Sequence, residues 1–92
     1  MLELISIMKA GEQWYLNKVI INPNHVVTIV SDGDMNNLMS EGKIGLGFRS
    51  GVSFSKVKMD ISSGFDEFIV VGSPNEILEK VNKTSSKQLL KG

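Results

Sequence analysis

The chain contains no cysteine, and this absence excludes several kinds of chemistry together. Disulfide bonds, thiol nucleophiles and thiolate metal sites all require cysteine, so the stability of the fold has to come from packing. A chain without cysteine also suits a reducing compartment, and we expect a cytoplasmic location. His25 is the single histidine and has no cysteine to partner it. We therefore expect it at the surface or at a strand edge rather than in a catalytic or metal site.

Excess charge of one sign and long apolar runs are absent as well. Ten basic residues balance ten acidic residues, so no overall field attracts nucleic acid or an anionic membrane. No apolar run reaches the roughly 18 residues that cross a bilayer, and Glu3 lies where a signal peptide would carry basic residues. We therefore expect no membrane partner. Nucleic acid would bind only through a local patch, such as the lysines near the carboxyl end.

The composition that remains is that of an ordinary folded domain. Apolar residues make up 41% and charged residues 22% of the 92 residues, which predicts one domain with a modest core. We expect the domain to span residues 1-82, with a helix that begins near residue 74, and a basic tail at residues 83-92 that is frayed or helical. A chain this short gains much from pairing with copies of itself, so we predict a homo-oligomer.

Four segments favour β-strands. Residues 2–8 and 14–21 are rich in leucine, isoleucine and valine, and Gly11 lies in the turn between them, which predicts a hairpin. In residues 25–31 the side chains that would point to each face of a strand include apolar ones, so both faces are apolar. We therefore predict a third strand that is central in the sheet or at an interface. Residues 68–72 form a further short run that is apolar on both sides.

The segment 43–61 also has the alternation of a strand. Apolar side chains alternate at Ile44, Leu46 and Phe48, and Gly51 can mark a turn. The alternation resumes at Val52 and Phe54 and then shifts by one residue before Val57. Such a shift is typical of a β-bulge, which we place near residues 55–56.

The helix near the carboxyl end carries the clearest local signal. Ser73 precedes Pro74, which takes the first helical position, and Glu76 has the spacing that closes a reciprocal capping box with the serine. These elements together predict an α+β fold, a small antiparallel β-sheet or partly closed barrel with one C-terminal α-helix. The helix residues that we expect to be buried are Ile77, Leu78 and Val81.

Residues 31–42 raise the question of a calcium site. Asp32, Asp34 and Asn36 have the spacing of the first three ligands of a helix-loop-helix calcium loop. The glycine that follows in that motif is replaced here by asparagine, and its final glutamate is replaced by Lys43. We therefore predict a polar connection between strands, and a calcium-dependent module is the alternative.

Glycines cluster at residues 45–51, where backbone N–H groups could approach an anion. The spacing differs from the dinucleotide-binding motif, because the third glycine comes one residue late and a strand is predicted to follow. Glycines that mark bulges or close packing are the simpler interpretation. The functional alternative is a pocket between subunits that encloses a nucleotide-like molecule. The ligand-binding residues that we predict are Gly47, Phe48, Arg49, Phe54, Trp14 and Tyr15.

Trp14 and Tyr15 are neighbours on a predicted strand, so their side chains must point to opposite faces. We expect one ring in the core and the other exposed as a contact residue. The serines lack a Gly-x-Ser-x-Gly elbow, and no positioned base is evident for a nucleophile. We therefore expect no enzymatic activity, and we predict neither a cofactor nor a metal.

Two segments resemble FlbD-like small flagellar-associated proteins. They are WYLNKVIINPNHVVTIV, residues 14–30, and FIVVGSPNEILEKV, residues 68–81. The similarity lies in an aromatic-Leu-Asn strand, two apolar strands and a capped helix, and the layout is also similar to short proteins encoded by bacteriophages. The chain departs from this layout in the insertion at residues 32–51 and in its additional amino-terminal strand. The resemblance implies a small protein without a catalytic motif.

The function that we expect is that of a non-catalytic binding module. It would be a homo-oligomeric, phage-type accessory protein that sequesters a small ligand or blocks a host protein. The alternative is a calcium-dependent or nucleic-acid-associated regulatory module.

Overall fold

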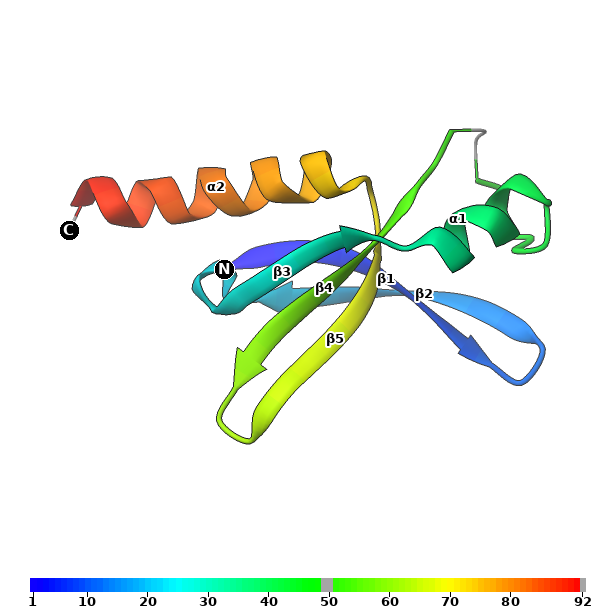
Figure 1. Cartoon of the computed structure of the whole chain (residues 1–92), viewed down its shortest axis with the longest axis horizontal. Helices are drawn as coiled ribbons and strands as arrows, with labels where there is room; N and C mark the ends of the chain where they lie inside the picture. Colours follow the sequence, from blue (N-terminus) through cyan, green and yellow to red (C-terminus); the bar gives the residue numbers. More distant parts are fainter. Residues whose placement is uncertain (49–50, 92) are drawn as a thin grey trace.

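The computed structural model of the chain describes residues 1–48 and 51–91, with side chains as far as Thr84. In this part of the chain, five strands form one sheet and helices pack around it (Figure 1). None of the helices in the described residues is long and apolar enough to cross a membrane. The elements in chain order are β1 Leu2–Ala10, β2 Gln13–Ile21, the 3-10 helix η1 Pro23–His25, β3 Val26–Ser31, α1 Gly33–Ser40, β4 Phe54–Ile61, β5 Gly64–Val71 and α2 Pro74–Lys91.

The sheet is antiparallel throughout and has the strand order β2-β1-β5-β4-β3. β1 and β2 form one hairpin, and β4 and β5 form the other. The first hairpin turns at Gly11, which has a φ of 61° that favours glycine. β2 and β3 are the two edges, so the sheet does not close into a barrel. The predicted α+β fold, an antiparallel sheet with a carboxy-terminal helix, is confirmed.

Helix α2 covers one face of the sheet and forms the first core with it (Figure 1). Val57 of β4, Val70 of β5 and Ile77 of α2 are fully buried at 0% exposure. Burial of each such side chain stabilises the fold by about 1.5 to 3 kcal/mol. The other buried members of this core are Leu2, Leu4, Ile21, Met59 and Val81.

The predicted start of α2 is confirmed. The Ser73 Oγ accepts a hydrogen bond from the Glu76 backbone N–H at 3.2 Å, and the Glu76 carboxylate accepts one from the Ser73 N–H at 3.3 Å. The prediction that Leu78 is buried is wrong, because its side chain is 46% exposed. Ile77 and Val81 are four residues apart and form the buried stripe, whereas Leu78 lies beside it.

A second core lies on the opposite face of the sheet, under helix α1. Phe54 begins β4 and is fully buried, and the ring of Phe48 meets it edge to face at a centroid distance of 5.7 Å and an interplanar angle of 83°. Met35 of α1 and Ile44 of the following segment cover these rings, and Ile7 of β1 completes the buried set. Helix α1 is therefore the lid of this second core.

The segment at residues 31–42 lies between two strands as predicted, but it contains helix α1, which the sequence did not predict. Asp32 is the N-cap, and its carboxylate accepts a hydrogen bond from the Met35 N–H at 3.1 Å. Met35 is 3% exposed, so tertiary packing stabilises a helix of low intrinsic propensity. The Asn36 side chain fixes the helix to the sheet, since its Oδ1 accepts from the Phe54 N–H at 2.7 Å.

Residues 43–48 do not form the predicted strand. Gly45 and Gly47 have φ values of 71° and 70°, in the left-handed region that is incompatible with a pleated strand. The alternating Ile44 and Phe48 side chains turn into the second core instead.

The predicted bulge at residues 55–56 is wrong as well, since β4 pairs with β5 in one continuous register. The apolar pattern shifts in β4 because Phe54 belongs to the second core and Val57 to the first, on opposite faces. The register shift in the sheet lies instead between Val26 and Thr28 of β3.

The predicted strand at residues 25–31 is present as β3, but it is an edge of the sheet and not a central strand. The alternative, a strand at an interface, stays a prediction. The apolar side chains on its second face are exposed, with Val27 at 48% and Val30 at 50%.

Candidate functional site

The two hairpins of the sheet are joined at one point. β1 pairs with β2 at nine register positions and β4 pairs with β5 at eight, whereas β1 and β5 pair at one in the described sheet, Ser6 opposite Val70. Beyond this pair the strands separate, and the tips of the two hairpins lie on opposite sides of Figure 1. The separation leaves an opening between two central strands.

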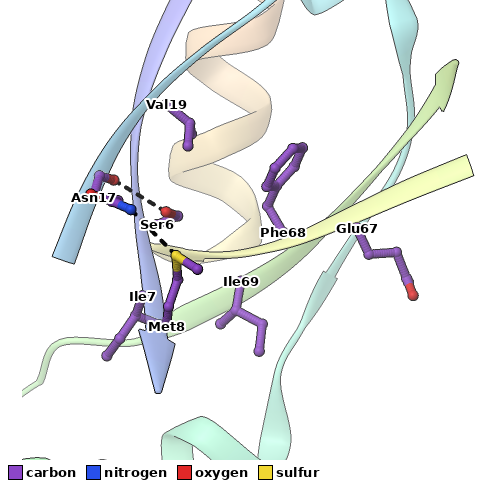
Figure 2. Close-up of a pocket in the computed structure, with 8 residues that line it drawn as sticks. All are labelled: Ser6, Ile7, Met8, Asn17, Val19, Glu67, Phe68 and Ile69. Atoms are coloured by element: carbon purple, nitrogen blue, oxygen red, sulfur yellow. Dashed lines mark hydrogen bonds between the residues drawn. The ribbon is translucent and has the colours of Figure 1, made fainter. Parts of the chain in front are cut away.

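A cleft of about 340 Å³ occupies this opening. Met8 lies between Ile7 and Ile69, with Ser6 and Asn17 above it in the view of Figure 2. The residues that line the cleft are Ser6, Ile7 and Met8 of β1, Asn17 and Val19 of β2, and Glu67, Phe68 and Ile69 of β5.

Side chains of both sheet faces line the cleft. By strand alternation from the Ser6 and Val70 pair, Met8 and Phe68 belong to the face that α2 covers, and Ile7 and Ile69 belong to the other face. In a fully paired sheet these two sets would lie on opposite sides of a hydrogen-bonded ladder. The separation of β1 and β5 exposes both sets to one mainly apolar space.

A short polar chain fixes one wall of the cleft. The buried Ser6 hydroxyl donates to the Asn17 backbone oxygen at 3.2 Å, and the Asn17 amide donates to the Met8 sulfur at 3.3 Å (Figure 2). These contacts hold Met8 over the cleft, although its side chain is 52% exposed. Methionine is flexible and polarisable, and such a side chain adapts to different apolar ligands.

The backbone of the cleft walls carries binding groups of its own. Each central strand uses its outer edge for its hairpin partner. On the inner edges, residues 7–10 and 64–69 have no register partner across the opening in the described structure. Every non-proline residue of a strand has an N–H donor and a C=O acceptor, so these edges can pair with another extended chain.

Ionisable groups are sparse at the cleft. Glu67 is the one ionisable residue among the described lining residues, and its side chain lies at the rim (Figure 2). Lys9 follows Met8 on β1, but its ammonium group lies over the Trp14 ring, 5.4 Å from the centroid. The cleft therefore offers apolar surface, backbone hydrogen bonds and one carboxylate, which suits recognition of a ligand.

The predicted ligand residues with described positions lie outside this cleft. Phe54 is buried in the second core with Phe48 against it, so its ring is not open to a ligand. Gly47 is exposed on the segment that precedes Phe48, and Arg49 lies outside the described residues.

Trp14 and Tyr15 point to opposite faces of β2, one partly buried and one exposed. Trp14 packs against the second core and lines a separate hollow of about 290 Å³ with Lys43 and Ile44. Tyr15 is 48% exposed, and its hydroxyl approaches Gln13 at 3.4 Å. None of the predicted residues with described positions lines the cleft between β1 and β5.

His25 has a structural partner. The His25 Nδ1 lies 2.8 Å from the Asp60 carboxylate. The His25 side chain is 54% exposed and the Asp60 side chain is 56% exposed. Over the described part of the chain, no group of three or more histidine, aspartate or glutamate side chains could hold a metal ion.

Comparison of the chain with models of protein families, with curated proteins and with solved structures gave no match. The resemblance to FlbD-like and phage-encoded proteins stays a prediction. Function has to be inferred from the geometry of the chain itself.

Sequence reasoning missed the residues of the cleft. Ser6, Asn17 and Phe68 lie in ordinary strand patterns, and nothing local distinguishes them. The cleft arises because β5 returns to β1 and then separates from it, a relationship between segments far apart in the chain.

Proposed function

We propose that the protein is a non-catalytic binding module that takes an extended polypeptide segment into the cleft between β1 and β5. The observation that carries the proposal is the single register pair between these strands. A module of this kind acts by occupancy, and in the cytoplasm it would block a partner protein as a phage-type accessory protein does.

The inner strand edges supply the first part of the recognition. When an extended peptide adds to a sheet, main-chain hydrogen bonds provide affinity and pockets for alternate side chains provide specificity. Residues 7–10 of β1 and 64–69 of β5 offer such edges. The peptide can pair with either edge, because the opening widens away from Ser6 and Val70.

The side chains of the cleft supply the second part. Met8, Val19 and Phe68 form apolar surface on one side of the opening, and apolar peptide side chains at alternate positions would fill it. Glu67 at the rim favours a lysine or arginine on the peptide. The expected ligand is therefore an extended apolar segment with a basic residue at one end.

Selection from a displayed library of random short peptides tests this proposal. We expect the selected peptides to share alternating apolar residues and a basic residue. Met8→Lys should weaken their binding by about tenfold or more, which corresponds to about 1.4 kcal/mol, because it places a charge in an apolar space. Failure to select any peptide, or unchanged affinity of this variant, would contradict the proposal.

Val30→Lys is the matched control. Val30 is 50% exposed and Met8 is 52% exposed, and both lie on strands, but Val30 is on the far edge strand β3. The control should bind the selected peptides as the wild type does. Circular dichroism of both variants would establish that each one is folded.

Sequestration of a small apolar molecule is the second candidate. The volume of about 340 Å³ favours it, since ligand pockets measure about 300 to 1,000 Å³. Native mass spectrometry of protein purified directly from its natural cells tests this function. Extra mass that leaves on denaturation would support it, and bare protein would exclude it in favour of the peptide.

A further inference from the structure

The outer edge of β2 is long and regular. β2 pairs with β1 from Gln13 to Ile21 without a register shift, and it contains no proline. Its other edge has no neighbouring strand in the described sheet. Such an edge presents a row of unpaired N–H and C=O groups that can pair with another chain.

The other edge of the sheet is less suited to pairing. β3 has six residues, and its register with β4 shifts between Val26 and Thr28. Short edge strands and bulges are devices that discourage pairing between sheets. Of the two edges, β2 is therefore the one that can continue the sheet.

On one face of β2, two apolar side chains lie symmetrically about Lys18. Leu16 and Ile20 lie two residues before and two residues after it, on the same face, and are 44% and 63% exposed. If two copies of β2 pair antiparallel about Lys18, each Ile20 lies directly opposite the Leu16 of the other copy. Cross-strand apolar pairs of this kind are the units that stabilise sheets.

We propose that β2 pairs antiparallel with β2 of a second copy, with the two-fold axis at Lys18, to give one continuous sheet across a homodimer. A twofold interface uses the same patch on both copies, and the repeat of apolar residues about one position provides this. The two copies carry no net charge, so no overall repulsion opposes their approach.

The charged side chains near the two-fold axis are compatible with this register. The pairing brings the two Lys18 side chains together, which alone would be unfavourable. Glu3 of β1 lies 3.7 Å from Lys18 within each chain and offsets the lysine charge. Across the centre of the dimer the order of charges would therefore be acid, base, base, acid, and each lysine has a glutamate of its own chain beside it. Asn17 and Val19 of β2 line the cleft, but the dimer uses the outer edge of β2 and the face that carries Leu16, Lys18 and Ile20. Either proposal can therefore fail alone.

Sedimentation velocity of the wild type and two matched variants tests the surface. The wild type should be dimeric at high micromolar concentration. Ile20→Lys should raise the dimer dissociation constant by about tenfold or more, because it replaces two apolar cross-strand pairs with charges next to Lys18. Phe65→Lys is the control, since Phe65 is 62% exposed against 63% for Ile20 but lies on β5. A monomeric wild type, or Ile20→Lys and Phe65→Lys with equal effects, would overturn the proposal.

Mixing of the wild type with Lys18→Glu tests the position of the axis. In the mixed dimer a lysine lies opposite a glutamate, whereas each pure dimer places like charges opposite each other. If the Lys18→Glu chain is uniformly labelled with 15N, so that the two chains differ in mass, native mass spectrometry should therefore show mixed dimers above the random share. A random or smaller share would exclude an axis at Lys18. Circular dichroism would show that Lys18→Glu is folded, as the 61% exposure of this side chain predicts.

Discussion

Ser6 and Val70 lie directly opposite each other and form the one register pair between β1 and β5 in the described sheet. Val70 is fully buried in the first core, and Ser6 is 3% exposed. The junction of the two hairpins is therefore held by buried side chains and by α2 across them rather than by a long ladder of backbone hydrogen bonds. The cleft therefore lies on one side of this pair, where β1 and β5 separate, and the first core with α2 holds the two strands together.

The second core should depend on Phe54. Phe54→Ala removes a fully buried ring that packs against Phe48 and Met35, so we expect a loss of about 3 to 5 kcal/mol in the free energy of unfolding. Phe65→Ala is the control, because Phe65 is 62% exposed. It removes a ring whose centroid lies 4.9 Å from the Lys58 ammonium, so its effect should be about 1 kcal/mol or less. Urea denaturation measures both. Equal effects of the two substitutions would show that Phe54 is not a core residue.

Helix α1 should depend on its N-cap. Asp32→Ala removes the acceptor of the Met35 N–H, and we expect a loss of about 1 kcal/mol in unfolding free energy. Asp32→Asn should retain most of the stability, because asparagine caps helices about as well as aspartate. If Asp32→Asn were as damaging as Asp32→Ala, the role of Asp32 would be its charge rather than its cap geometry.

The start of α2 should depend on Gly72. This glycine has a φ of 131°, and an added Cβ would lie 3.0 Å from the Ile77 Cδ1. Gly72→Ala should therefore destabilise the fold by about 1 to 3 kcal/mol. Gly33→Ala, at the start of α1, has open space for a Cβ and should be neutral or stabilising by up to about 1 kcal/mol. Thermal unfolding of both variants checks this contrast, and a Gly72→Ala variant as stable as the wild type would contradict it.

The elements that sequence reasoning identified are those whose signals are local. Ser73 and Glu76 form the capping box because both partners lie within one helical turn. Helix α1 was not predictable in the same way. Its residues have low helix propensity, and its stability comes from the burial of Met35 against strands far away in the chain.

The functional residues were the hardest to predict. The alternation from Ile44 to Phe48 indicates a strand, but the left-handed conformations of the intervening glycines direct these side chains into a core. Phe54 was predicted as a ligand residue, but it begins β4 and is fully buried in the second core. The cleft depends on where β1 and β5 stop pairing, and no property of either strand alone specifies this point.

Amide hydrogen exchange, resolved residue by residue by NMR, is the most direct test of the central claim that the inner edges of β1 and β5 form a peptide site. In the free protein, amides that face the opening in residues 7–10 and 64–69 should exchange faster than the amides paired between β1 and β2. A peptide selected for binding should slow exchange on one of these inner edges, with little change on β3. Inner-edge amides that exchange equally fast with and without the bound peptide would contradict the account.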